Sequence, residues 1–168
     1  ESFGVQGGIG LISSRLLLEG PIGKNGLGSY LVAGRRSYGD LFLPLFNIDN
    51  TAFFYDLNWN VNVNMSSNDY LSFYGYHGND KFEIVDVFGN QWGNTAVGLS
   101  WNRVFNSSLV GKFSLIYTLY DYGLDIFAPG QAFAWRADLA QSIFPAELSC
   151  SICENLVADF GLRLAYYD

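Results

Sequence analysis

Charged residues are scarce in this sequence. They make up 15% of the 168 residues, against about 25% in ordinary globular chains. The few basic residues stand singly, apart from Arg35 and Arg36, and the formal net charge is −7. Because phosphate binding needs clustered Lys and Arg, we expect no nucleic-acid partner.

Long apolar runs are also lacking. A helix that spans a bilayer needs roughly 18 to 20 consecutive apolar residues, and no stretch of the sequence approaches that length. A helical membrane protein is therefore excluded. The sequence does not open with a secretory signal peptide. If the protein is exported, we expect that the signal was cleaved or that the sequence begins inside a longer chain.

Side chains that carry catalysis or bind metals are few. His77 is the single histidine, and no Ser, Cys or second His pairs with it, so an interfacial or lumen-facing role is simpler than that of a catalytic base. Asp121 and Asp125 share a face if their segment is a strand, but their position near a loop suggests solvated acids. The other loop acids lack the spacing of a calcium-binding EF-hand: Asp80, Glu83 and Asp86. We expect no enzyme activity, no cofactor and no metal.

The two cysteines form the sequence Cys150-Ser-Ile-Cys153. Two thiolates without further His or Cys make half a zinc site, and the helix that normally follows a redox CxxC is not indicated. The pattern therefore predicts a small loop disulfide, Cys150 to Cys153, in an oxidising envelope compartment.

Aromatic residues, at 17%, and 19 glycines are abundant. The clearest pattern lies at 55–65, where apolar side chains alternate without a miss against one Asp and four Asn. Successive side chains of a strand point to opposite faces, so one face is apolar and the other is polar. A strand of this length suits a tilted crossing of a bilayer, which needs roughly 9–11 residues. The stretch predicts a strand in a membrane wall.

Similar alternation recurs along the chain. We expect about nine strands, at 3–10, 11–19, 29–38, 55–65, 70–78, 95–104, 109–124, 133–140 and 156–166. Short connections at 20–28, 66–69, 105–108 and 143–155 alternate with longer ones at 39–52, 79–94 and 123–131. Short periplasmic turns and longer extracellular loops are typical of outer-membrane barrels, which in bacteria have an even strand number. An odd count, with the sequence ending in mid-alternation, predicts an incomplete wall.

The alternation assigns side chains to two sides of that wall. We expect these to line a wide, wet lumen: Asp56, Asn58, Asn60, Asn62, Asn64, Ser100, Asn102, Arg136, Asp138 and Arg163. We expect these to face lipid: Tyr55, Leu57, Trp59, Val61, Val63, Leu99, Trp101, Phe113, Leu115, Tyr117, Phe160, Leu162 and Leu164. Trp135 is interpreted as one more lipid-facing aromatic residue.

Several short motifs resemble the start of the barrel in TonB-dependent outer-membrane receptors, in the branch with a carboxypeptidase-like regulatory domain. They begin with Gly7-Gly-Ile-Gly-Leu-Ile-Ser-Ser-Arg-Leu-Leu-Leu-Glu-Gly-Pro-Ile22 and continue in the same order at 30–40, 54–58, 75–80, 92–94 and 114–122. The resemblance covers roughly residues 3–125 and fades from Phe127 onward.

The resemblance implies an all-β fold in which residues 1–168 form part of an antiparallel, up-and-down transmembrane β-barrel of about 22 strands with a plugged lumen. The plug and the TonB-contacting box are absent from the sequence. The implied function is import of a scarce nutrient across the bacterial outer membrane with TonB-coupled energy. The implied partners are membrane lipid, the TonB system and, in some cases, a surface lipoprotein or other envelope chains.

Two alternatives remain open at this point. The first is a complete eight-stranded outer-membrane barrel with a structural or adhesive role, in which the first and last strands pair. The second is a soluble all-β binding module. Strand closure separates the first alternative from the receptor wall, and extraction without detergent separates the second from both.

Overall fold

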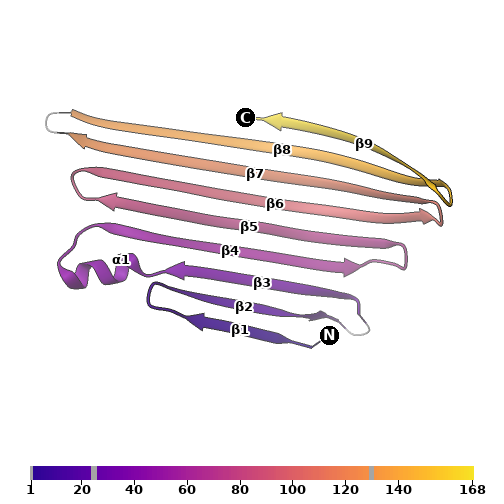
Figure 1. Cartoon of the computed structure of the whole chain (residues 1–168), viewed down its shortest axis with the longest axis horizontal. Helices are drawn as coiled ribbons and strands as arrows, with labels where there is room; N and C mark the ends of the chain where they lie inside the picture. The colour runs from indigo at the N-terminus through magenta and orange to yellow at the C-terminus, as the bar shows by residue number, and fades with distance from the viewer. Residues whose placement is uncertain (1, 24–25, 129–130) are drawn as a thin grey trace.

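The computed structural model describes residues 2–23, 26–128 and 131–168. It is an all-β structure in which nine antiparallel strands form one sheet in sequence order, as Figure 1 shows. The strands are β1 (Gly4–Ile9), β2 (Ser13–Ile22), β3 (Gly28–Ser37), β4 (Thr51–Asn64), β5 (Asp69–Ile84), β6 (Phe88–Asn106), β7 (Leu109–Ala128), β8 (Gln131–Cys153) and β9 (Leu156–Tyr167). The expected count of about nine strands and the all-β class are confirmed.

The strands lengthen toward the C-terminal half of the sheet. β6, β7 and β8 have 19, 20 and 23 residues, roughly twice the 9–11 residues that cross a bilayer. Hydrogen bonds of short side chains stabilise two of the tight turns. In the β4–β5 turn the Ser66 hydroxyl donates to Asp69 (2.7 Å), and in the β6–β7 turn the Asn106 side chain accepts from the Ser108 backbone N–H (2.8 Å). Such short side chains stabilise turns by bonding nearby backbone or side-chain groups.

The expected alternation of short and long connections is wrong. Residues 79–94 are not a loop: β5 and β6 run through them and turn at 85–87, where Asp86 takes the left-handed conformation (φ 62°). β7 likewise continues to Ala128 through the loop expected at 123–131, of which 129–130 lie outside the described residues. Most of 143–155 belongs to β8. Their Gly and charged residues look loop-like in sequence, but the strands of both hairpins are paired through these residues.

The remaining long connection joins β3 to β4. It contains the short helix α1 (Gly39–Phe42) and a 3-10 helix, η1 (Leu43–Phe46). It lies at the same end of the sheet as the β1–β2 and β5–β6 turns, on the left in Figure 1. No helix among the described residues is long and apolar enough to cross a membrane.

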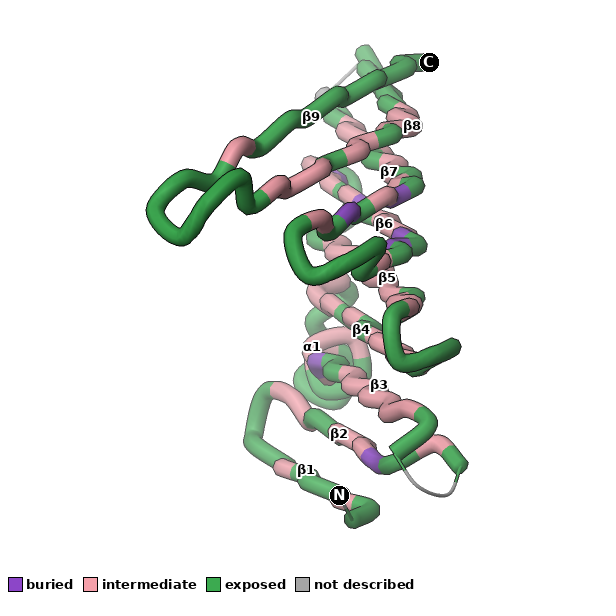
Figure 2. Tube along the Cα trace, turned by 90° about the vertical axis from the view of Figure 1, so that its right-hand side faces the viewer, coloured by how far each residue is buried: buried purple, intermediate pink, exposed green. Residues whose placement is uncertain are grey.

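The sheet is a single twisted layer, and no described segment forms a second layer on either face (Figure 2). No large apolar side chain is buried in the described parts of the chain. The surface area is 11585 Å², whereas a compact monomer of 18.7 kDa exposes about 8,300 Å². The excess means that this sheet does not contain the core that would stabilise a globular domain in water.

The two edges of the sheet are far apart. β1 pairs only with β2 and β9 only with β8, and the sheet is not closed. The alternative of a complete eight-stranded barrel requires eight strands and pairing of the first strand with the last. The described sheet has nine strands, and β1 does not pair with β9. β9 pairs with β8 from Gln141 to Cys153, and Asp168 exchanges two backbone hydrogen bonds with Ala140. The first nine residues of β8 have no partner on that side among the described residues.

Candidate functional site: the two faces of the sheet

Cross-strand pairing decides which side chains share a face, because directly paired residues of antiparallel strands point the same way. We name the two faces after β4. The valine face carries Val61 and Val63, and the asparagine face carries Asn60 and Asn62. Every other side chain is assigned by following the register from strand to strand.

The register groups most of the expected site residues as the sequence predicts. All the lipid-facing candidates share the valine face: Tyr55, Leu57, Trp59, Val61, Val63, Leu99, Trp101, Phe113, Leu115, Tyr117, Phe160, Leu162 and Leu164. Most of the lumen-facing candidates share the asparagine face: Asp56, Asn58, Asn60, Asn62, Asn64, Ser100, Asn102 and Arg163. The sheet therefore brings each set together on one surface.

Arg136 and Asp138 are corrections to this grouping. Arg136 pairs with Gly123 and Asp138 with Asp121, and β7 residues of that parity lie on the valine face with Leu115 and Tyr117. The error has a physical cause: the apolar residues of β8 change face along the strand, so its first half cannot be assigned by taking the apolar side as the membrane side.

We call one part of the sheet its lower half. It begins at the 65–68, 107–108 and 154–155 turns and ends at the row of paired residues Leu57–His77–Thr95–Leu119. Between the row Leu71–Trp101–Phe113 and the upper border, the valine face there forms a continuous apolar band without a charged side chain among the described residues. Asp69 and Arg103 lie on the same face, between the band and the turns. Its surface is close-packed: an ideal Cβ at Gly75 would lie 2.1 Å from the Trp59 ring. Glycine at this position lets the indole lie flat across β5.

Charged groups mark both borders of the band. At the turn side, Asp69 accepts hydrogen bonds from the Trp101 ring N–H and from Arg103, both 3.0 Å. On the other side the first polar row begins at Asn79 and includes Asp121. The ten residue steps from Asp69 to Asn79 span about 34 Å along β5. At the 35–45° tilt of barrel strands this projects to about 26 Å, close to the roughly 25 Å apolar band of outer-membrane barrels.

The asparagine face of the lower half carries the charges that the band lacks: Arg15, Glu19, Arg35, Asp56, Lys112, Glu147, Asp159 and Arg163. Arg35 and Asp56 form an ion pair of 2.7 Å. Shorter polar groups fill the spaces between strands, such as the Ser100–Ser114 hydrogen bond of 2.5 Å. This face is suited to contact with water or with polar protein surface.

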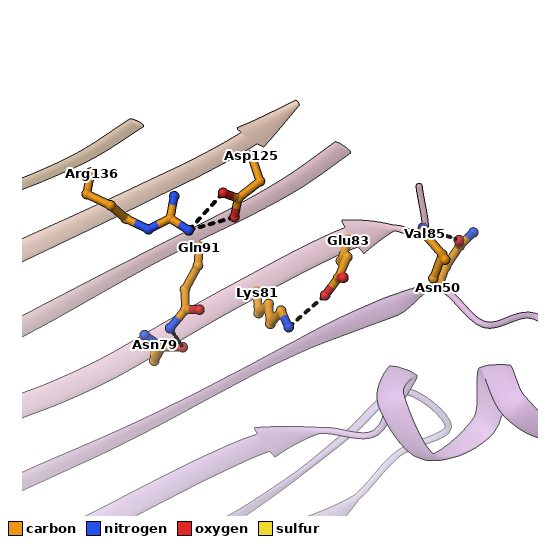
Figure 3. Close-up of polar contacts among 8 residues, drawn as sticks. All are labelled: Asn50, Asn79, Lys81, Glu83, Val85, Gln91, Asp125 and Arg136. Atoms are coloured by element: carbon orange, nitrogen blue, oxygen red, sulfur yellow. Dashed lines mark hydrogen bonds and ion pairs between the residues drawn. The ribbon is translucent and has the colours of Figure 1, made fainter. Parts of the chain in front are cut away.

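The polarity of both faces reverses in the upper half of the sheet, which we define as residues 78–94 of the β5–β6 hairpin and 120–139 of the β7–β8 hairpin. The valine face here is polar (Figure 3), with ion pairs Arg136–Asp125 (2.8 Å) and Lys81–Glu83 (2.7 Å). Gln91 also lies on this face and donates to Asn79 (3.4 Å). Its remaining strand positions are Gly89, Gly93, Asp121, Gly123, Phe127, Ala132, Ala134 and Asp138, of which Phe127 is the one large apolar side chain among the described residues.

The asparagine face of the upper half is apolar and rich in rings: Phe82, Phe88, Trp92, Tyr122, Leu124, Ile126, Phe133, Trp135 and Leu139. Asp80 is its one charged side chain among the described residues. Trp135 lies here, edge-on to Tyr122 with ring centroids 6.2 Å apart. The interpretation of Trp135 as a residue on the same face as the lipid-facing candidates is therefore wrong.

A sequence signal for the reversal exists. In β7 most apolar residues occupy odd positions up to Leu119, with Val110 and Ile116 as exceptions, and even positions from Tyr120 to Ile126. β8 makes the matching change between Leu139 and Phe144. A change of parity within one long alternating stretch indicates that the environment of each face changes along the strand.

The isolated candidate residues do not assemble into a catalytic site. His77 lies on the valine face at the upper border of the band, where its Nδ1 is 2.9 Å from the Thr95 hydroxyl oxygen. No metal-binding cluster of three or more His, Cys, Asp or Glu is found in residues 2–23, 26–128 and 131–168.

The expected disulfide is not formed. Cys150 and Cys153 are free and belong to β8 rather than to a loop. Three residues of strand separate their Cα atoms by about 10 Å, beyond the reach of a disulfide, which needs less than about 7 Å.

Comparison with known proteins gives no identification: no family model, no curated protein and no solved structure matches the chain.

Proposed function

We propose that this chain is part of the wall of an outer-membrane β-barrel that imports a scarce nutrient. The observation that carries the proposal is the uncharged band on the valine face, about 26 Å high, opposite a face that holds every charge of the same level. A soluble sheet would expose this band to water, whereas lipid makes it the stable arrangement.

The reversal of polarity supports an orientation. A wall that faces lipid on one side and the lumen on the other needs apolar side chains outward only within the bilayer. Above it the outer side meets water, and there the valine face becomes polar. The upper hairpins would thus project about 17–24 Å along the strands beyond the outer leaflet, and the 65–68 and 107–108 turns would lie on the periplasmic side.

A wall of more than nine strands accounts for the open edges. Unpaired backbone groups are not tolerated in lipid, so β1 and β9 would pair with further strands. Beside Tyr70, Tyr74 and Tyr76, the asparagine face carries many short amide and hydroxyl side chains, whereas a small barrel is filled by interlocking side chains. Both features favour a segment of a large barrel with a wide lumen over a closed barrel of eight strands.

Active transport rests on the resemblance of residues 3–125 to TonB-dependent receptors. The chain would contribute wall and no chemistry, with energy supplied by the TonB system, which contacts other parts of such receptors. Membrane lipid would surround the valine face, and a surface lipoprotein or another envelope chain is a further partner compatible with the projecting hairpins. The location would be the bacterial outer membrane.

Fractionation of cells that express the full gene product tests the proposal. We expect the protein in the outer-membrane fraction, resistant to high salt and carbonate and released only by detergent. A soluble periplasmic binding protein serves as the control for leakage. Recovery of the folded protein in the soluble fraction without detergent would contradict a membrane wall and favour the soluble binding module.

Coupling to TonB needs a second measurement. We expect the detergent-purified full gene product to be retained by an immobilised C-terminal domain of TonB, and not by the same resin without that domain. Outer-membrane localisation without any TonB binding would support the wall and contradict energy-coupled import.

A further inference from the structure

The β3–β4 connection exposes an unusual concentration of apolar side chains. Its apolar residues on the surface are Leu41, Phe42, Leu45, Phe46 and Ile48, and Leu45 and Phe46 are 74% and 72% exposed. No charged residue occurs from 41 to 48. Surface loops in water are normally polar, and a cluster of this kind marks a contact with something apolar.

The segment begins at the level where the apolar band ends. Arg36, near the end of β3, pairs with Tyr55, and Tyr55 pairs with Asn79. Asn79 belongs to the first polar row of the valine face, which continues through Gly93 to Asp121. The helices α1 and η1 follow directly above this row, at the height of the outer border of the proposed bilayer.

Ionic and aromatic contacts connect the segment to the valine face. Asp40 forms an ion pair of 2.6 Å with Arg36, and Arg36 lies over the Phe53 ring at 5.5 Å from its centroid. Arg36 and Phe53 both belong to the valine face. Tyr38 and Phe42 pack edge to face, with centroids 5.9 Å apart. The start of α1 is therefore held on the side that would face lipid.

We infer that residues 41–48 form an interfacial anchor that inserts its apolar side chains among the lipid headgroups of the outer leaflet. The inference rests on the proposed function, since the bilayer must already border the valine face. Continuity with the band selects lipid as the occupant: the apolar cluster adjoins the border where the bilayer would end. Apolar and aromatic side chains beside paired charges are the composition found at that depth.

Spin-label accessibility tests the inference in the full gene product, reconstituted in lipid vesicles. With Cys150 and Cys153 replaced by Ser, a nitroxide is attached to Phe46→Cys. Leu99→Cys, in the band, is the lipid reference, and Gln91→Cys, on the same face above the band, is the water reference. Collision with oxygen reports lipid, and collision with a neutral nickel chelate reports water.

We expect an oxygen-to-nickel accessibility ratio at Phe46 that is several-fold higher than at Gln91 and below that at Leu99. Leu45→Cys should give the same ordering if the label at Phe46 perturbs folding. A water-like ratio at Phe46 beside a lipid-like ratio at Leu99 would overturn the anchor and leave the membrane wall standing. Low collision with both reagents at Phe46 would mean a protein cover and would also overturn the anchor. A water-like ratio at Leu99 would overturn the wall itself.

Discussion

Replacement of Val61 by Lys is expected to lower the free energy of unfolding in lipid vesicles by about 2–4 kcal/mol. Val61 lies in the middle of the band, paired with Tyr30 on one side and Phe73 on the other. An ammonium group there cannot reach water without displacing lipid or bending toward a border. Urea titration of the reconstituted protein, followed by tryptophan fluorescence, measures the loss.

The adjacent residue provides the matched control. Asn60→Lys places the same charge at the same level of the sheet but on the asparagine face, which borders water in the proposed wall. The Asn60 carbonyl oxygen has no hydrogen-bond partner among the described residues, so its removal breaks no observed bond. We expect a change within about 0.5 kcal/mol. Equal losses for the two variants would show that the two faces do not differ in environment.

The position of the outer border gives the second large effect. Leu99 and Gln91 lie on the same face of the same strand, β6, eight residues apart. Leu99→Lys should lose about 2–4 kcal/mol of unfolding free energy, because it lies in the band. Gln91→Lys should change it by no more than about 0.5 kcal/mol, because Gln91 lies beside the ion pairs of the upper half. The same urea titration measures both variants.

A large loss of unfolding free energy for Gln91→Lys would mean that the border lies farther out and that the bilayer also covers the polar row from Asn79 to Asp121. A small loss at both positions would remove the bilayer from this face altogether. The Leu99 and Gln91 variants therefore test where the band ends along the strands. The Val61 and Asn60 variants test which face of the sheet borders lipid.

Strand number and face could be predicted wherever one environment extends along a whole segment. At 55–65 every odd residue is apolar and every even residue is polar, so period-two alternation was sufficient to place Trp59 and Asn60 on opposite faces. Similar alternation at Phe160 to Leu164 gave the correct grouping for β9.

Prediction failed where the environment changes along a strand. β8 passes from a region with its apolar side on the asparagine face to one with its apolar side on the valine face. Taking the apolar side as constant put Arg136, Asp138 and Trp135 on the wrong faces. The glycines and charges of 79–94 suggested a loop because a strand with one polar face and several glycines has the composition of a loop. The short turn at 85–87 is set by pairing across the hairpin, which composition does not encode.

The Cys150–Cys153 pair shows a related limit. Their spacing in sequence is compatible with a small disulfide only if the segment is a turn. Pairing of β8 with β7 up to Cys150, and with β9 as far as Cys153 with one register shift after Ser151, keeps the backbone in a strand here, and this separates the sulfurs. Long-range pairing thus overrides what the local motif suggests.

The central claim is that the valine face of the lower half borders lipid while the asparagine face does not. The four tryptophans can report the environment of both faces. Trp59 and Trp101 lie in the band, and Trp92 and Trp135 lie on the asparagine face of the upper half. In single-tryptophan variants, with Phe at the other three positions, quenching by lipids brominated on the acyl chains should be strong for Trp59 and Trp101 and near zero for Trp92 and Trp135. Equal quenching of all four, or stronger quenching of Trp135 than of Trp101, would contradict the claim.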